Sequence, residues 1–131
     1  LDLAILVHAG VDIGLPEPVH CPPDKALAML KETQAEKLIL AHYGGYAQWD
    51  MVEEYLVGEK VYFDTSFLVG RIEEEQFLRI AKNHGTDKIL FGSDSPWTSQ
   101  KDSLDFIRKL NLDEQNKEQI LGLNAKNLLG I

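Results

Sequence analysis

A single cysteine, Cys21, occurs among the 131 residues of the chain. One thiol excludes an intrachain disulfide framework and a cysteine-based zinc knuckle. No apolar run approaches the roughly 20 residues that a membrane-spanning helix needs, and no cluster of lysine and arginine resembles a nucleic-acid-binding surface. We therefore expect neither a membrane nor a nucleic acid as a partner.

Basic residues are outnumbered as well, because 13 lysines and arginines face 21 aspartates and glutamates, for a net charge of −8. This acidity favours solubility and disfavours binding to phosphate backbones. The chain opens on Leu1 directly before an apolar strand pattern, so we expect no signal peptide. Together these features predict a cytoplasmic protein.

Four segments of the chain share one pattern, in which a short apolar run ends in polar residues or glycine and a stretch with helical periodicity follows. Near-continuous apolar runs are typical of strands buried on both faces of a parallel sheet. Alternation of strands with helices predicts parallel strands joined by right-handed crossovers. The predicted strands span residues 3–7, 37–41, 61–63 and 88–91.

The helical stretches have recognisable ends. Asp24 is expected to cap the first helix, the helix over 72–81 is expected to end at Gly85, and Asp113 is expected to cap the last one. No linker interrupts the pattern, so residues 1–131 are predicted to form one α/β region. Four βα units make half of a (β/α)8 TIM-like barrel, which takes about 250 residues when complete. An open α/β sheet is the alternative.

Function in barrels and in open α/β sheets sits at the carboxyl ends of the strands. His8, His42 and Asp94 each come at the end of an apolar run, and Asp64 ends the third run. Each also has a structural interpretation. The two histidines could be hydrogen-bonded core residues, Asp94 could cap the following loop, and Asp64 could be a turn residue or a second layer behind a site.

Two imidazoles and a carboxylate from neighbouring strand ends make a ligand set for a divalent metal, with zinc as the first expectation and manganese or iron as alternatives. Such an ion lowers the pKa of a coordinated water to about 7. Asp94 can then take the proton of the water as it attacks a carbonyl, and His42 is a second ligand or a proton-transfer partner. Gly44 and Gly45 are expected to let the backbone approach a ligand closely.

Other residues near the strand ends are substrate-binding candidates. His20, in the proline-rich loop after the first strand, could contact substrate or be a solvated loop residue. Trp97 could line a pocket or plug the barrel rim, and Ser95 lies on the same loop. His84 lies near a helix C-terminus, where a cation is favoured, and this position needs no functional interpretation.

Residues 6–10 (LVHAG), 38–45 (LILAHYGG) and 89–97 (ILFGSDSPW) resemble the strand-5, strand-6 and strand-8 motifs of the amidohydrolase superfamily. The similar branch is amidohydrolase-2, with its aminocarboxymuconate-semialdehyde decarboxylase-like enzymes. Residues 61–66 (VYFDTS) look like strand 7 of that branch, and 124–130 (NAKNLLG) look like its closing helix. The resemblance covers nearly the whole chain.

This resemblance implies a TIM-like barrel with a mono- or dinuclear metal centre. His8 matches the strand-5 metal histidine, His42 matches the strand-6 histidine, and Asp94 matches the strand-8 aspartate, a metal ligand and general base. Members of the branch hydrolyse amides, esters and lactones, or carry out metal-assisted non-oxidative decarboxylation. The His-x-His pair of the family's first strand is absent from this sequence, together with strands 1 to 4.

The leading hypothesis is therefore the C-terminal half of a metal-dependent hydrolase that is active when intact and inactive as an isolated chain. Its expected partners are a small-molecule substrate and the missing N-terminal half of the barrel. A metal-dependent decarboxylase is the second hypothesis. A non-catalytic half-barrel that pairs with itself as a homo-oligomer, or with a partner, is the third, because exposed barrel-edge strands favour such pairing.

Overall fold

The computed structural model describes residues 2–131, which form a sheet of parallel strands in the order β1-β2-β3-β4. Each strand pairs with the next one in the sequence, as where Leu40 lies beside Phe63. The predicted α/β architecture with parallel strands is confirmed. The strands are β1 (Ile5–Val7), β2 (Leu38–Leu40), β3 (Tyr62–Asp64) and β4 (Ile89–Leu90).

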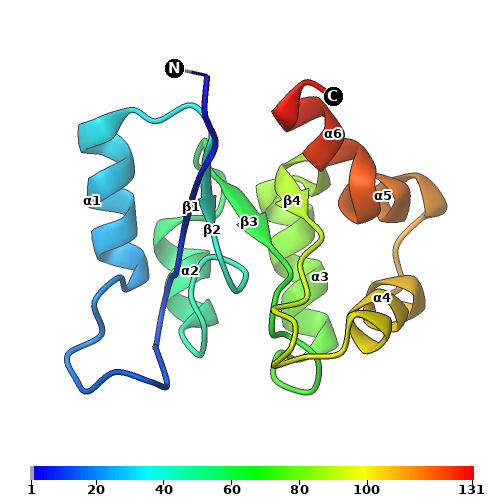
Figure 1. Ribbon diagram of the computed structural model, residues 1–131, viewed down its shortest axis with the longest axis horizontal. Helices are drawn as coiled ribbons and strands as arrows, with labels where there is room; N and C mark the ends of the chain where they lie inside the picture. The colour runs from blue at the N-terminus through cyan, green and yellow to red at the C-terminus, as the bar shows by residue number, and fades with distance from the viewer. Residues whose placement is uncertain (1) are drawn as a thin grey trace.

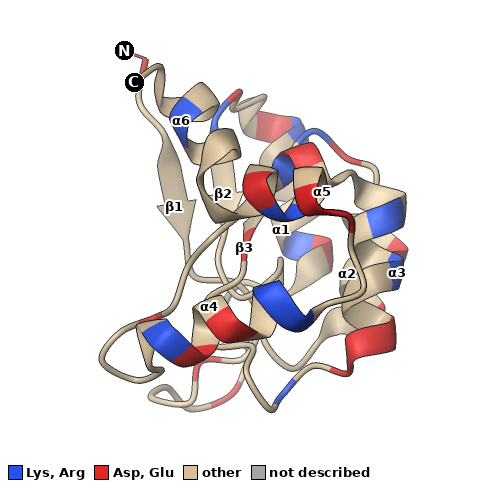
Figure 2. Ribbon diagram, turned by 90° about the vertical axis from the view of Figure 1, so that its right-hand side faces the viewer, with Lys and Arg blue, Asp and Glu red and all other residues tan. Residues whose placement is uncertain are grey.

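Helices follow each strand. Those of the described residues are α1 (Pro23–Thr33), α2 (Trp49–Tyr55), α3 (Glu74–His84), α4 (Gln100–Lys109), α5 (Glu114–Glu118) and α6 (Asn124–Leu129). A 3-10 turn (Thr86–Lys88) precedes β4, and a π-helical turn (Gln119–Leu123) joins α5 to α6. Figures 1 and 2 show α1, α2 and α3 on one side of the sheet and α4 to α6 beyond β4. Across residues 2–131, every helix is too short or too polar to cross a bilayer.

The helix ends follow the predictions at two of three positions. Gly85 ends α3, and the Asp113 side chain caps α5 by accepting a backbone hydrogen bond from its first turn. The expected cap at Asp24 is wrong, because Pro22 occupies the cap position and Pro23 begins α1. Proline suits the first helical position, where its missing N–H would have had no partner within the helix.

The core lies between the sheet and its helices and joins α3 to the loop after β2. Tyr43, Phe63 and Phe77 are fully buried. The rings of Tyr43 and Phe77 stack with centroids 4.4 Å apart, and the Tyr43 hydroxyl donates to the Phe77 carbonyl at 3.2 Å. Burial raises the pKa of Tyr43 well above its ordinary value. This packing anchors the segment that begins with His42.

β1 departs from the prediction of strands buried on both faces. Ile5 and Leu6 are 51% and 62% exposed, and Leu3 just before the strand is 66% exposed. Within residues 2–131 this strand pairs along one edge only, with β2, and Figure 2 shows it at the margin of the molecule. Its apolar side chains therefore lack the neighbours that bury those of β2, β3 and β4.

His84 differs from the expected cation at a helix C-terminus. Its side chain is buried beneath the Phe63 ring, with centroids 4.0 Å apart. Nδ1 accepts from the Gly58 N–H at 3.1 Å, and Nε2 lies 2.9 Å from the Val61 carbonyl oxygen. Burial, reinforced by the nearby Lys88 ammonium, lowers the pKa of His84 from 6.5 to about 4. The imidazole is thus neutral near pH 7 and joins α3 to the segment before β3.

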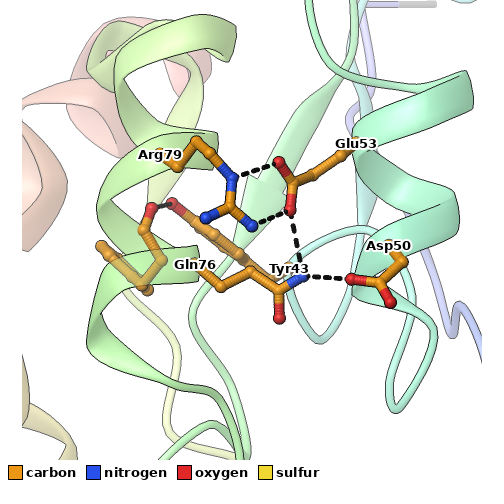
Figure 3. A network of polar contacts seen from close by, with 6 residues as sticks. Tyr43, Asp50, Glu53, Gln76 and Arg79 are labelled. Atoms are coloured by element: carbon orange, nitrogen blue, oxygen red, sulfur yellow. Dashed lines mark hydrogen bonds and ion pairs between the residues drawn. The ribbon is translucent and has the colours of Figure 1, made fainter.

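A polar network on the outer surface links α2 to α3 (Figure 3). Arg79 donates two hydrogen bonds of 2.7 Å to the two carboxylate oxygens of Glu53. The Gln76 amide donates to both Asp50 and Glu53. The hydrogen bond from Arg79 is the main cause that lowers the pKa of the Glu53 carboxyl. Because ion pairs that face solvent add little stability, we assign this network to the alignment of the two helices.

Candidate metal centre

The loops that follow the strands gather at one end of the sheet, the lower end in Figure 1. A cavity of about 490 Å³ lies among these loops. The predicted ligands His8, His42 and Asp94 all line it, as does Trp97. The remaining lining residues are Val11, Asp12, Ile13, Gly14, Tyr46 and Phe67.

His8 and His42 meet in this cavity. His8 Nδ1 and His42 Nε2 lie 3.1 Å apart, and the two ring planes cross at 66°. His8 is exposed beyond the edge strand β1, whereas His42 is 7% exposed. Two nitrogens bound to one tetrahedral zinc ion at about 2.0–2.1 Å would lie about 3.3 Å apart. The pair therefore already has nearly the spacing of two ligands of one ion.

A layer of hydrogen bonds holds His42 from behind. Its Nδ1 lies 3.1 Å from both the backbone carbonyl oxygen and the hydroxyl oxygen of Ser66. The Ser66 hydroxyl donates to Asp64 Oδ1 at 2.5 Å, and the same oxygen accepts from the backbone N–H groups of His42 and Ser66 at 3.0 and 2.9 Å. Trp49 Nε1 donates to the His42 carbonyl at 3.1 Å. Asp64 thus lies in a second layer behind the site, one of the two roles that its position in the sequence suggested.

Three non-glycine residues of the cavity adopt left-handed backbone conformations. The φ angles are 56° at His42, 62° at Phe67 and 59° at Asp94. Such conformations cost about 1–3 kcal/mol each and persist where surrounding contacts enforce them, often at functional sites. At His42 those contacts are the hydrogen bonds to Asp64 and from Trp49.

Asp94 lines the cavity from the loop after β4. Its backbone carbonyl accepts from the N–H groups of Trp97 and Thr98 at 2.9 and 3.2 Å, so it also begins a turn. Over residues 2–131, no three histidine, cysteine, aspartate or glutamate side chains converge closely enough to hold a metal ion. The structure therefore brings two imidazoles together and leaves the carboxylate in the same cavity, outside that pair.

The substrate-binding candidates separate in the structure. Trp97 lines the cavity and is 77% exposed, while His20 and Ser95 are exposed on neighbouring loops and are not among its lining residues. Tyr46 and Phe67 add aromatic walls that no sequence motif indicated, with ring centroids 5.4 Å apart. Their positions depend on loop folding, which apolar periodicity does not report.

The glycines near the site make close contacts with other parts of the protein. A Cβ on Gly44 would lie 2.8 Å from the Phe63 ring, and one on Gly45 would lie 3.0 Å from Pro23. Neither glycine is among the lining residues of the cavity, and the expectation that the pair brings backbone close to a ligand stays a prediction. Gly10, two residues after His8, has φ 86°, and a Cβ there would lie 2.2 Å from the Tyr46 nitrogen.

A family model described as amidohydrolase matches residues 1–131. The chain belongs to the amidohydrolase family. The match confirms the relationship to the amidohydrolase-2 branch that the strand-end motifs predicted. A comparison with curated proteins finds no match.

Solved structures share the fold of this amidohydrolase chain. An uncharacterized TIM-barrel protein from Bordetella bronchiseptica aligns with 98% of the chain at 17% identity and a TM-score of 0.75, over 46% of its own length. A dihydroxybenzoic acid decarboxylase from a Polaromonas species, with bound manganese and an inhibitor, aligns with 78% of the chain at 21% identity and a TM-score of 0.58, over 36% of its length. An amidohydrolase from Burkholderia multivorans with bound zinc aligns with 82% of the chain at 16% identity and a TM-score of 0.65, over 50% of its length.

The chain thus spans half or less of each of these three proteins. The likeness shows that its fold is part of a TIM barrel. Two of the three solved structures contain a divalent metal, manganese in one and zinc in the other. The imidazole and carboxylate groups in the cavity of this chain are donors that suit either ion.

Proposed function

We propose that this chain supplies His8, His42 and Asp94 to the divalent-metal centre of a hydrolase that cleaves an amide, ester or lactone. The observation that carries the proposal is the 3.1 Å approach of His8 Nδ1 to His42 Nε2 in a cavity that Asp94 also lines. When bound, the ion supplies Lewis acidity and makes water more acidic at neutral pH. Zinc is the first candidate, and manganese and iron are alternatives.

Each residue has a role in this proposal. His8 and His42 would hold the ion through the two nitrogens that face each other. The Asp94 carboxylate takes a proton from the attacking water and returns it to the leaving group, as a general base and then a general acid. The aromatic wall of Tyr46 and Phe67 holds a flat part of the substrate and excludes water. His20 and Ser95, on adjoining exposed loops, remain candidates for contacts with its outer part.

Non-oxidative decarboxylation is the second candidate. The Arg71 guanidinium lies 3.6 Å from the centroid of the ring of Phe67, a lining residue of the cavity, although Arg71 is not itself a lining residue. A cation and an aromatic surface together suit an aromatic carboxylate. In that reaction a carbon–carbon bond breaks, carbon dioxide leaves, and the remaining carbon receives a proton, for which Asp94 is the candidate donor.

The proposed enzyme needs more strands than this chain contains. The chain spans half or less of its solved relatives, and Leu3, Ile5 and Leu6 leave apolar surface exposed along β1. We propose that the remaining barrel strands pair along β1 and cover this surface. A second copy of the chain is the alternative occupant, as in a non-catalytic half-barrel dimer.

Metal titration tests the metal centre directly. Calorimetry of the 131-residue chain with zinc or manganese near neutral pH is expected to show one bound ion per chain. His8→Ala and His42→Ala should each weaken binding by about 100-fold or more, a larger loss than the roughly 10–100-fold typical of residues behind a ligand. His20→Ala is the matched control and should bind as the parent chain does. Unchanged affinity in His42→Ala would refute the ligand assignment.

Product analysis separates the two reactions. The chain would be supplied with a polypeptide carrying the remaining strands and loaded with metal, then offered a lactone and an aromatic acid. Release of acid from the lactone supports the hydrolase, and release of carbon dioxide from the aromatic acid supports the decarboxylase.

A further inference from the structure

We propose that Asp64 and Ser66 are positioning residues that hold His42 in its Nδ1–H tautomer and thereby direct the Nε2 lone pair at His8. The benefit of this tautomer for metal binding rests on the proposed function, whereas the tautomer is a property of the chain itself. The proposed metal ligands are His8, His42 and Asp94. The positioning role therefore belongs to two other residues, Asp64 and Ser66.

The tautomer follows from what surrounds Nδ1. A backbone carbonyl oxygen can only accept a hydrogen bond, and that of Ser66 lies 3.1 Å from His42 Nδ1. The one hydroxyl proton of Ser66 is directed to Asp64 Oδ1 at 2.5 Å, so the hydroxyl oxygen, also 3.1 Å from Nδ1, presents a lone pair. Two acceptors facing one ring nitrogen require that nitrogen to carry the proton.

In a neutral imidazole with its proton on Nδ1, the opposite ring nitrogen is an acceptor. Without a metal, His42 Nε2 bears a lone pair and lies 3.1 Å from His8 Nδ1, which donates to it. A metal held by both nitrogens would require His8 to carry its proton on Nε2 instead. A ring nitrogen must present a lone pair to bind a metal, and a histidine ligand usually donates its other N–H to a carbonyl or carboxylate. Ser66 supplies that acceptor for His42.

Asp64 holds both His42 and Ser66 in place. Its Oδ1 accepts from the backbone N–H groups of His42 and Ser66 and from the Ser66 hydroxyl. Asp64 and Ser66 are 9% and 6% exposed, so water competes little for these bonds. One carboxylate oxygen therefore holds the backbone of the histidine and the residue that orients its ring.

His84 provides an internal contrast with His42. It accepts a backbone N–H at Nδ1, so its proton must be on Nε2, where it donates to the Val61 carbonyl. At mildly alkaline pH the chain is thus expected to contain two buried histidines in opposite tautomers, each fixed by a backbone group. A method that distinguishes ring nitrogens can test both assignments in one sample.

Nitrogen-15 NMR of the labelled chain, through two-bond couplings in the imidazole rings, is the experiment. At mildly alkaline pH we expect His42 with the proton on Nδ1 and His84 with the proton on Nε2. Asp64→Ala should convert His42 to a mixture of tautomers and leave His84 unchanged. Asp64→Asn keeps an acceptor oxygen and should restore the parent tautomer. Ser103→Ala removes a buried hydroxyl that donates to the carbonyl of Ser99, the cap residue of α4, and should change neither histidine.

Two results would overturn the proposal: a proton on His42 Nε2 in the parent chain, or an unchanged His42 tautomer in folded Asp64→Ala. Circular dichroism establishes whether that variant folds. If it does not, the parent spectrum and Ser66→Ala decide, since loss of the hydroxyl acceptor should broaden or shift the Nδ1 signal and an unchanged signal counts against the role of Ser66.

Zinc titration of the same proteins separates this proposal from the metal hypothesis. Asp64→Ala should bind zinc about 10–100-fold more weakly than the parent chain, and Asp64→Asn should lose less. The predicted tautomer in a chain that binds no zinc would sustain the positioning role and defeat the metal centre. Zinc binding by a chain with the proton on His42 Nε2 would support the metal centre and defeat the positioning role.

Discussion

Acidification is expected to destabilise the fold through His84. Its neutral imidazole accepts the Gly58 N–H at Nδ1, and a proton added there would remove that acceptor while placing a charge against the Phe63 ring. Burial and the Lys88 ammonium oppose this charge, which is why the pKa is lowered from 6.5 to about 4.

The sign and size of the effect follow from proton linkage. Between pH 6.5 and about 4 the unfolded chain carries the His84 proton and the folded chain does not, so the free energy of unfolding decreases as pH falls. The contribution is fully present above about 6.5 and is lost as pH approaches 4. At about 1.4 kcal/mol per pH unit the loss is about 3 kcal/mol, a large part of the roughly 5–15 kcal/mol by which domains are stable.

Urea unfolding across this pH range would measure the loss. His84→Gln offers an amide that can accept and donate but does not titrate, so it should lose about 3 kcal/mol less than the parent chain on acidification. His20→Gln removes an exposed histidine and should keep the parent dependence. Parallel curves for the parent chain and His84→Gln would refute the assignment.

Two further predictions concern the loop after β1 and the exposed strand itself. Gly58→Ala should lower the free energy of unfolding by about 1–3 kcal/mol, which is what positive φ costs a side chain. Gly10→Ala should lower it by more, because both glycines have positive φ but only at Gly10 would a Cβ clash, 2.2 Å from the Tyr46 nitrogen. Equal losses in urea unfolding would contradict this. The isolated chain should self-associate in sedimentation velocity because β1 exposes apolar side chains. Leu6→Lys should reduce the association and Leu129→Lys on α6 should not, whereas a monomeric parent chain would argue against pairing through β1.

The order and direction of the strands could be predicted because the signals are local. Each apolar run is short, each is followed by helical periodicity, and these patterns are legible within one βα unit. The gathering of His8, His42 and Asp94 around one cavity was predictable for the same reason, since the carboxyl ends of parallel strands meet at one edge of a sheet. Whether they bind metal remains a prediction.

Features that depend on distant residues were not accessible from the sequence. The apolar sequence of β1 is the same whether or not another strand pairs with its free edge. The exposure of its side chains is therefore evident only from the structure. His84 is neutral because burial and the Lys88 ammonium lower its pKa, and the backbone groups that its ring contacts, at Gly58 and Val61, lie 26 and 23 residues earlier in the chain. Ser66 orients His42 across a separation of 24 residues. The motif that contains Ser66 (VYFDTS) indicated a polar strand end but did not indicate which residue Ser66 would contact.

The position of the ligands on the sheet makes them unequal. His8 follows β1 and Asp94 follows β4, the two edges of the sheet in residues 2–131. Three strand spacings of about 4.8 Å would separate these edges by about 14 Å in a flat sheet, yet both residues line one cavity. Closing a barrel fixes strand tilt and stagger and hence the distance between the two edge strands. His42 is held by its own hydrogen bonds, whereas the place of Asp94 beside the two histidines depends on the strands that complete the barrel.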